Sequence, residues 1–382
     1  MTNIIIIGTG LAGYNLAREI RKRDKTVGLQ LFSEDDGAFY SKPMLSNALA
    51  KQKQPAQLAM KSAEQMAQEL NADIRSDISI THIDPQAKQI QANGETFSYD
   101  KLVLAVGARP FVAPAQGDAV NAVMTVNNLT DYAQFRTAIE GKRHVAIIGP
   151  GLIGCEFAND LVAADYQVTV IGPDKTPLEQ LLPAQAGEAL QQKLQQQGVQ
   201  WKLGLTVAQV NQQAEQYQLT LSDGSVVQAD VVLSAIGLRA DLTLAQQAGL
   251  ACERGIVVDR YLTTSDASIF ALGDCAQVDG LVLPFVLPLM QSARTLATTL
   301  TGEQTAVSYP PMPVVIKTPA YPIVVSPPPR DAQGQWQVDA TQEGVTARFL
   351  HDDALLGFAL TGTAVSEKQA LTKLLPAVLA DV

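Results

Sequence analysis

The chain has 382 residues, enough for two or three domains of about 150 residues each. Its formal net charge of -10, together with the lack of any basic run, excludes a general nucleic-acid binder. No apolar stretch approaches the roughly 20 residues that cross a bilayer. Its three cysteines, Cys155, Cys252 and Cys275, form no C-x-x-C pair, which argues against a zinc ribbon or a redox dithiol. We expect a cytoplasmic protein.

The first predicted element is a strand, Ile4 to Ile7, that runs directly into Gly8-Thr9-Gly10-Leu11-Ala12-Gly13. Its length and the lack of a basic flank indicate a strand and not a signal peptide. Four isoleucines in a row suit a strand buried on both faces of a parallel sheet. In this G-x-G-x-x-G pattern the first glycine permits a tight turn and the second lets the backbone approach a pyrophosphate. The third lets the following helix, predicted over 14–23, pack against the strand. The pattern predicts a dinucleotide site.

Candidate ligand-binding residues, both acidic and basic, follow the second predicted strand, Leu29 to Phe32. Ser33 and Glu34 end that strand, and Glu34 lies about 20 residues beyond the fingerprint, where a carboxylate binds a ribose. The alternative for Glu34 is a solvated acidic turn. Lys42, beside a proline at a helix start, fits two positions equally well. One is the surface, and the other is against a flavin, where a cation stabilises the anionic reduced ring.

Four further strands are predicted before the middle of the chain, two of them in a hairpin. Ile78, Ile80 and Ile83 alternate with polar residues, and a hairpin over 89–97 turns at Asn93-Gly94. The next strand begins near Tyr99 and ends in Ala105-Val106-Gly107-Ala108-Arg109-Pro110. Its glycine lets the chain pass close to a ligand, and its proline ends the strand. Residues 111–141 lack clear periodicity and are interpreted as a crossover.

A second complete fingerprint follows the strand 144–148: Gly149-Pro150-Gly151-Leu152-Ile153-Gly154. Two such patterns, each between a buried strand and a helix, predict two dinucleotide sites. Asp174 ends the next strand about 20 residues later, where a carboxylate favours NADH over NADPH. The neighbouring Lys175 is the one feature there that would suit NADPH.

The rest of this half contains a polar helix over 185–197, short strands, and a buried strand over 231–236 that leads into Gly237. That strand resembles the earlier one ending at Arg109, so the two halves share one plan. A later strand ends in Leu272-Gly273-Asp274 and places Asp274 at the carboxyl end, where α/β folds bind ligands. Asp274 is interpreted as a flavin ribityl contact, and a helix N-cap is its alternative. A helix over 289–300 follows.

Prolines at 310, 311 and 313 mark a boundary before a small β region and a last helix, Ser366 to Leu379. The expected fold is α/β, with two Rossmann-like, glutathione-reductase-type domains and a small α+β C-terminal domain. The FAD-binding domain is expected over 1–110 and 241–310, the NADH-binding domain over 111–240, and the C-terminal domain over 311–382.

The order of the two fingerprints, the A-x-G-A-x-P stretch and the A-L-G-D-C motif resembles the pyridine nucleotide–disulfide oxidoreductase superfamily over essentially the whole chain. The chain lacks the redox-active cysteine pair, so it is similar to the branch that reduces small iron or iron–sulfur proteins. Within that branch it most resembles the rubredoxin–NAD+ reductase family. Three segments carry this resemblance: Tyr40 to Ser46, Gly149 to Leu161 and Pro313 to Pro329.

The resemblance implies tightly bound FAD at the first fingerprint and NADH as substrate at the second, with no metal. The implied FAD contacts are Gly8, Thr9, Gly10, Leu11, Ala12, Gly13, Ser33, Glu34, Lys42, Ile80, Ala105, Arg109, Glu156, Asp274, Val286 and Lys317. The implied NADH contacts are Gly149, Gly151, Leu152, Ile153, Gly154, Asp174 and Gly237. No residue acts as acid or base, and Glu156 and Lys42 lie near the flavin. Asn47 departs from relatives that carry lysine there, so either Lys42 or Lys317 supplies the partner of Glu156.

The implied activity is hydride transfer from NADH to FAD and single-electron transfer to rubredoxin, which in turn feeds an alkane hydroxylase or a similar enzyme. One alternative is a ferredoxin or flavorubredoxin acceptor. Another is an NADH oxidase or peroxidase, but residues 40–50 lack the cysteine that such enzymes use. The last is a redox-gated interaction protein. Because rubredoxins are usually acidic, docking calls for a local basic rim, for which the candidates are Lys42, Lys51, Lys53, Arg294, Lys317 and Arg330.

Overall fold

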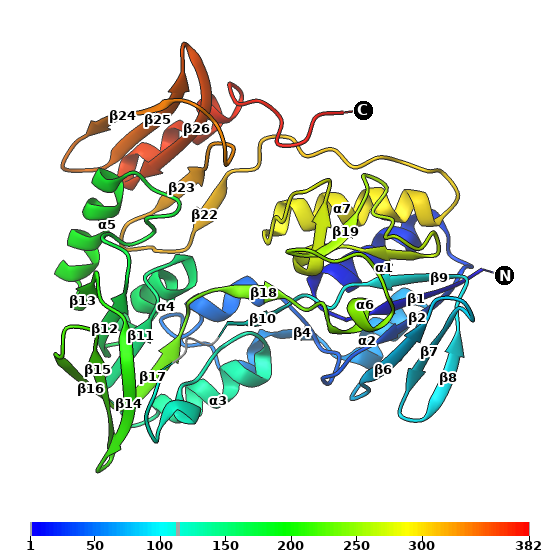
Figure 1. Cartoon of the computed structure of the whole chain (residues 1–382), viewed down its shortest axis with the longest axis horizontal. Coiled ribbons are helices and arrows are strands. Elements are labelled where there is room, and N and C mark those ends of the chain that lie inside the picture. The colour runs from blue at the N-terminus through cyan, green and yellow to red at the C-terminus, as the bar shows by residue number, and fades with distance from the viewer. Residues whose placement is uncertain (1, 112–114, 382) are drawn as a thin grey trace.

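The computed structural model describes residues 2–111 and 115–381 (Figure 1). Its first lobe is built on a five-stranded parallel sheet in the order β20-β9-β1-β2-β5. Four strands come from the first part of the chain and one from far later: β1 (Asn3–Ile7), β2 (Gly28–Phe32), β5 (Asp73–Arg75), β9 (Lys101–Leu104) and β20 (Ile269–Ala271). The sheet therefore unites the two segments that flank the second lobe.

The middle strand of this sheet, β1, is the isoleucine run. Ile4, Ile5 and Ile6 are 0% exposed, as the continuous β-branched pattern predicts. Helices α1 (Leu11–Arg23) and α7 (Val286–Leu300) pack against each other and share the core with this sheet (Figure 1).

A three-stranded antiparallel sheet of β6 (Ile80–Asp84), β7 (Gln89–Ala92) and β8 (Glu95–Ser98) joins the same core. Its hairpin turns at Asn93-Gly94, both with positive φ, which confirms the turn predicted from the sequence. The strand expected over Ile78 to Ile83 begins only at Ile80, so Ile78 lies outside it.

Shorter elements complete the first lobe and its edge toward the second. They are β3 (Phe39–Tyr40), η1 (Lys42–Asn47), η2 (Pro55–Leu58), β4 (Ala59–Lys61), α2 (Ala63–Leu70), α6 (Thr243–Gln247), β19 (Ile256–Val258), η4 (Gly273–Cys275) and β21 (Ala276–Val278).

The second lobe repeats the plan with a four-stranded parallel sheet in the order β13-β12-β11-β17. A three-stranded antiparallel sheet and the helices surround it. The elements are η3 (Val120–Ala122), α3 (Leu129–Ile139), β11 (His144–Ile148), α4 (Leu152–Val162), β12 (Gln167–Gly172), α5 (Ala184–Gln196), β13 (Val199–Leu203), β14 (Val207–Gln213), β15 (Gln216–Leu221), β16 (Val226–Ala229) and β17 (Val231–Ser234).

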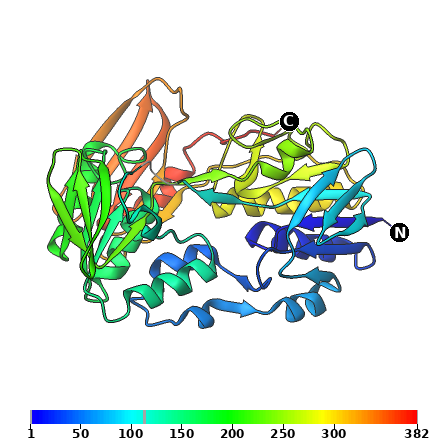
Figure 2. The same cartoon turned by 60° about the horizontal axis from the view of Figure 1, so that its bottom comes forward.

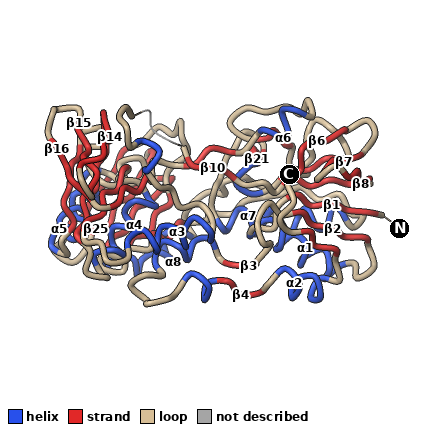
Figure 3. The backbone as a smooth tube through the Cα atoms, turned by 90° about the horizontal axis from the view of Figure 1, so that it is seen from below, coloured by secondary structure: helices blue, strands red, loops and turns tan. Residues whose placement is uncertain are grey.

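The chain enters and leaves the second lobe through one antiparallel pair, β10 (Ala108–Pro110) and β18 (Leu238–Ala240). Figure 3 shows β10 between the two lobes. Because the two connections pair with each other, the lobes are joined by a two-stranded ribbon and not by two independent linkers.

The third part is a five-stranded antiparallel sheet in the order β22-β23-β26-β25-β24. Its elements are β22 (Val314–Ile316), β23 (Ile323–Ser326), β24 (Gln335–Ala340), β25 (Val345–His351), β26 (Ala354–Thr361), η5 (Gly362–Glu367) and α8 (Lys368–Thr372). Together the sheets confirm the expected α/β class with a small third part.

The last helix is shorter than predicted, and the expectation of a helix to Leu379 was wrong. The α-helix ends at Thr372, and Pro376 then prevents its continuation because proline lacks the N–H of a helical residue. The tail instead runs back to the first lobe, where Leu379 exchanges two backbone hydrogen bonds with Tyr309 (2.8 and 3.0 Å). In Figure 1 the C-terminus accordingly lies beside the first lobe.

This return of the tail predicts a clear difference between two leucines near the C-terminus. Leu379 is 8% exposed and belongs to the core of the first lobe, whereas Leu374 is 65% exposed. We expect Leu379→Ala to lower the free energy of unfolding by about 2 kcal/mol, because a buried leucine leaves a cavity. Leu374→Ala, the matched control, should change it by less than about 0.5 kcal/mol. Urea titration measures both changes. Equal values would show that the packing of the tail against the first lobe does not stabilise the fold.

Candidate functional site

The first fingerprint follows β1, and its three glycines serve different needs. Gly8 has a φ of +108°, and a Cβ there would lie 2.3 Å from the carbonyl oxygen of Ala105. A Cβ on Gly13 would lie 1.9 Å from the carbonyl oxygen of Gly8. Gly8 and Gly13 are therefore demanded by the packing of the chain itself. A Cβ on Gly10, by contrast, would meet no protein atom within 4 Å.

The second fingerprint reproduces this division. Gly149 has a φ of +110° and approaches the carbonyl of Ala235, and a Cβ on Gly154 would lie 1.9 Å from the carbonyl oxygen of Gly149. Gly151 again faces open space. Gly10 and Gly151 are the N-caps of α1 and α4, and neither carries a side-chain cap. Each helix start therefore presents free backbone N–H groups to an uncrowded space, which fits a pyrophosphate.

The end of β2 is joined to the first fingerprint by hydroxyl contacts. The hydroxyls of Thr9 and Ser33 lie 2.5 Å apart, and Ser33 also donates to Asp35 at 2.5 Å. Glu34 is exposed, and one of its oxygens lies 3.9 Å from the Arg109 guanidinium. A solvent-facing carboxylate beside the glycine turn fits a ribose.

Arg109 lies on the connecting ribbon. It forms an ion pair with Asp241 at 2.6 Å, which raises the pKa of the guanidinium. The predicted FAD contact is therefore tied to the point where the chain returns to the first lobe.

Asp274 lies in η4, directly after β20, as the sequence indicates. Its carboxylate accepts no hydrogen bond from the part of the chain that the structure describes. Burial raises the pKa of Asp274, while the nearby Lys42 lowers it. A half-buried carboxylate without protein donors fits a ligand that brings hydroxyl groups, such as a ribityl chain.

Replacing Asp274 is therefore expected to raise the stability of the protein and to weaken FAD binding. Because its folded pKa is raised, stability is lost as pH rises from the unfolded pKa through the folded one. We expect Asp274→Asn to raise the melting temperature of FAD-free protein at pH 7 and to have no such effect near pH 3.

The same variant should bind FAD about tenfold more weakly, because a charge-assisted hydrogen bond becomes a neutral one. Calorimetric melting and FAD titration measure the two effects. A variant that is less stable at pH 7 would contradict this account. Asp266→Asn is not a suitable control because that carboxylate caps a turn, so the exposed Asp353→Asn serves instead.

Lys42 begins η1, which packs beside α3 (Figure 2). Its side chain is half-buried, and its Nζ donates to Asn127 Oδ1 at 2.6 Å. Burial lowers the pKa of Lys42, whereas Asp274 and Asp131 raise it. Lys42 is therefore held by Asn127 in a partly buried position and is not a freely solvated lysine.

Glu156 is 0% exposed and is held by three contacts from two segments. Ser46 Oγ donates to it at 2.5 Å, the backbone N–H of Lys317 donates to it at 2.8 Å, and Lys317 Nζ forms an ion pair with it. Lys317, and not Lys42, is therefore the partner of Glu156. The buried carboxylate is stabilised by charge and by two further donors, as such groups require.

The same face of α4 carries two residues that sequence reasoning missed. Asp160 accepts from the backbone N–H groups of Leu49 and Ala50, both at 3.0 Å, and Asn159 accepts from that of Ala320 at 3.1 Å. Their spacing of three and four residues from Glu156 was a usable signal, since such residues share a helix face. Together the three side chains attach η1 and β22 to α4.

The remaining predicted residues lie at strand and helix ends. Ile80 is buried at the start of β6, and Val286 is the first residue of α7 and 41% exposed. Asp174 follows β12 and is half-buried, and Gly237 has a φ of +111° between β17 and β18. Leu152 and Ile153 open α4.

The cysteines do not resemble redox centres. The thiols of Cys155 and Cys275 are buried and donate to backbone carbonyls at 3.3–3.4 Å. Burial raises the pKa of Cys275 to about 12, so its reactive thiolate is suppressed.

The expected basic rim needs a correction. Lys42 and Lys317 point inward to Asn127 and Glu156 and are not available as free surface cations. The other four candidates, Lys51, Lys53, Arg294 and Arg330, are exposed.

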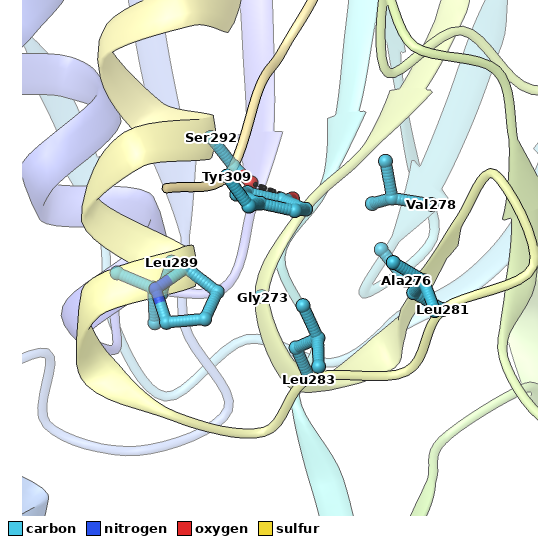
Figure 4. Close-up of a pocket in the computed structure, with 9 residues that line it drawn as sticks. Gly273, Ala276, Val278, Leu281, Leu283, Leu289, Ser292 and Tyr309 are labelled. Atoms are coloured by element: carbon cyan, nitrogen blue, oxygen red, sulfur yellow. Dashed lines mark hydrogen bonds between the residues drawn. The ribbon is translucent and has the colours of Figure 1, made fainter. Parts of the chain in front are cut away.

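The small cavity shown in Figure 4 lies behind this site. Gly273, Leu289, Ser292 and Tyr309 are among the residues that line it, and the hydroxyls of Ser292 and Tyr309 lie 2.7 Å apart. Its volume of about 10 Å³ suits roughly one water molecule.

The profile of the family described as "Pyridine nucleotide-disulphide oxidoreductase" matches residues 2–300. The chain belongs to this oxidoreductase family. A second profile, described as "Rubredoxin binding C-terminal domain", matches residues 306–375 of this oxidoreductase.

The oxidoreductase is 49% identical to the rubredoxin–NAD(+) reductase of Alcanivorax borkumensis, over 99% of this chain and 100% of the relative. It is 41% identical to the nitric oxide reductase FlRd–NAD(+) reductase of Vibrio vulnificus, over 95% of each chain. A crystal structure of the covalent putidaredoxin reductase–putidaredoxin complex matches with a TM-score of 0.88 and 25% identity, over 98% of this chain and 94% of that one. The resemblance to rubredoxin–NAD+ reductases is thus confirmed. Among the described residues, no helix is both long and apolar enough to traverse a bilayer.

Proposed function

We propose that this oxidoreductase uses FAD to take a hydride from NADH and to pass electrons singly to rubredoxin. The observation that supports this proposal is the contact between Glu156 and Lys317. That residue lies on the helix of the second fingerprint, and its partner Lys317 lies in the region matched by the rubredoxin-binding profile. A buried ion pair thereby connects the proposed NADH site with the proposed acceptor side.

In this proposal FAD, when bound, supplies hydride acceptance and one-electron release. The first fingerprint, Ser33 and Glu34 hold its nucleotide half, while Asp274 receives a ribityl hydroxyl. The second fingerprint holds the NADH pyrophosphate, and Asp174 receives its ribose. Lys42 provides positive charge, and Glu156 with Lys317 closes the site.

The domain boundaries belong to the proposal as well. The FAD-binding domain comprises 1–110 and 241–310, the NADH-binding domain 111–240, and the C-terminal domain 311–382. The antiparallel ribbon of β10 and β18 supports the two inner boundaries, since the chain changes lobes there in both directions.

A flavorubredoxin is the second candidate acceptor, because relatives such as that of Vibrio vulnificus carry this activity in their name. Delivery of electrons onward to an alkane hydroxylase, and a cytoplasmic location, also remain part of the proposal.

An anaerobic experiment separates the acceptors. The purified FAD-loaded protein is reduced with NADH, and then rubredoxin, ferredoxin or flavorubredoxin is added and its absorption spectrum followed. We expect rapid reduction of rubredoxin. Reduction of ferredoxin with none of rubredoxin would overturn the proposal, and failure of NADH to bleach the flavin would overturn the enzymatic activity itself.

Ionic strength tests the remaining basic rim. If the exposed cations Lys51, Lys53, Arg294 and Arg330 attract an acidic partner, the rate of rubredoxin reduction should fall as salt rises. A rate that does not change with salt would show that these cations do not attract rubredoxin and that docking depends on apolar contacts.

A further inference from the structure

Asn127 is a residue of the crossover that connects two distant segments through one side chain. Its Oδ1 accepts from Lys42 Nζ at 2.6 Å, and its Nδ2 donates to the carbonyl oxygen of Ala108 at 2.8 Å. Its backbone N–H donates to Asp131 at 2.9 Å, which attaches it to the first turn of α3. Both side-chain groups and the backbone N–H of Asn127 are therefore in use.

These bonds determine which way the amide points. The carbonyl of Ala108 can only accept and the ammonium of Lys42 can only donate. A flip of the Asn127 amide would place donor against donor and acceptor against acceptor. The contact with Lys42 is thus oriented by β10, the entering strand of the ribbon between the lobes.

Lys42 has no other hydrogen-bond acceptor in the part of the chain that the structure describes. An ammonium carries three donors, and Asn127 takes one of them. The charged groups that act on it are Asp274 in η4 and Asp131 on α3. A long lysine side chain loses conformational entropy when it is held in one position, so a fixed position needs a partner such as Asn127.

We propose that Asn127 is a positioning residue that holds the ammonium of Lys42 at the flavin ring and thereby sets the midpoint potential of the flavin. This inference rests on the proposed function, because it requires bound FAD. A positive charge held at the ring favours the anionic reduced form over the neutral oxidised form. Release of the lysine makes reduction less favourable.

A double-mutant cycle tests whether Asn127 acts through Lys42. The variants are Asn127→Ala, Lys42→Gln and the double variant, and the readout is the midpoint potential of bound FAD against dyes of known potential. We expect Asn127→Ala to lower the affinity for reduced relative to oxidised flavin about tenfold, which is about 30 mV for a two-electron couple. In the Lys42→Gln background the same change should have no further effect.

A matched pair of charge variants provides the control. Asn127→Asp places a carboxylate on the ammonium, whereas Asn128→Asp adds the same charge one position away, where Asn128 caps α3 and aspartate caps equally well. We expect a more negative potential for Asn127→Asp and little change for Asn128→Asp. The isosteric Asn127→Asp also keeps the test open should Asn127→Ala not fold.

Three outcomes overturn the inference: an unchanged potential in Asn127→Ala, an equal shift in the Lys42→Gln background, or equal shifts in the two aspartate variants. Failure of the proposed function looks different, since the wild-type protein would then bind no FAD or would not be bleached by NADH.

Discussion

Replacing Lys317 by methionine is expected to lower the free energy of unfolding by about 3 kcal/mol, because breaking a buried pair leaves the other charge uncompensated. Glu156 has no exposed surface and keeps only the donors Ser46 Oγ and the backbone N–H of residue 317. The hydrophobic stem of methionine replaces most of the lysine volume, so the loss reports on the charge and not on a cavity. Guanidinium titration of FAD-free protein measures it.

Two further variants test whether the loss of stability comes from the buried charge. Lys22→Met removes an exposed ion pair with Glu19 and should change stability by less than about 0.5 kcal/mol. Adding Glu156→Gln to Lys317→Met should restore most of the loss, since the buried charge is then absent. A Lys317→Met variant as stable as Lys22→Met would show that the pair does not hold the third domain to α4.

Alanine at the two kinds of fingerprint glycine is expected to separate folding from binding. Gly154→Ala puts a Cβ 1.9 Å from the carbonyl oxygen of Gly149, so strand and helix must move apart. The gain of helix propensity, about 1 kcal/mol, is smaller than the cost of that overlap. We expect Gly154→Ala to lose at least about 4 kcal/mol, or to leave the second lobe unfolded.

Gly151→Ala should behave in the opposite way. Its Cβ meets no protein atom, and the backbone φ of −77° suits alanine, so stability should stay within about 0.5 kcal/mol. The methyl group occupies the space proposed for the NADH pyrophosphate, and we expect NADH to bind at least about tenfold more weakly, or about 1.4 kcal/mol.

Thermal melting and stopped-flow reduction by NADH measure the two properties. Gly10→Ala, the counterpart at the first fingerprint, should retain the fold and bind FAD at least about tenfold more weakly, while NADH affinity, measured by titration, stays unchanged. If Gly151→Ala binds NADH normally, the open space at α4 is not the nucleotide site.

The chain's local patterns were enough to predict the central strands of both parallel sheets. Buried β-branched runs such as Ile4 to Ile7, followed by glycines at fixed spacing, specify strand, turn and helix through contacts between near neighbours in sequence. The hairpin at Asn93-Gly94 was predicted for the same reason, because positive φ at both positions is a property of those residues. The predicted last helix was wrong beyond Thr372, because Pro376 cannot continue a helix.

The partners of charged side chains were decided by the tertiary structure alone. Glu156 and Lys317 are 161 positions apart, and Lys42 and Asn127 are 85 apart, so no periodicity connects them. Lys42 and Lys317 were equal candidates for Glu156 in the sequence because both are lysines near the same predicted site. Only the packing of η1 and β22 on α4 directs one lysine to the glutamate and the other to the amide. The sequence alone therefore predicted two nucleotide sites from local patterns, and the assembly of three distant segments decided which charged groups lie together at Glu156.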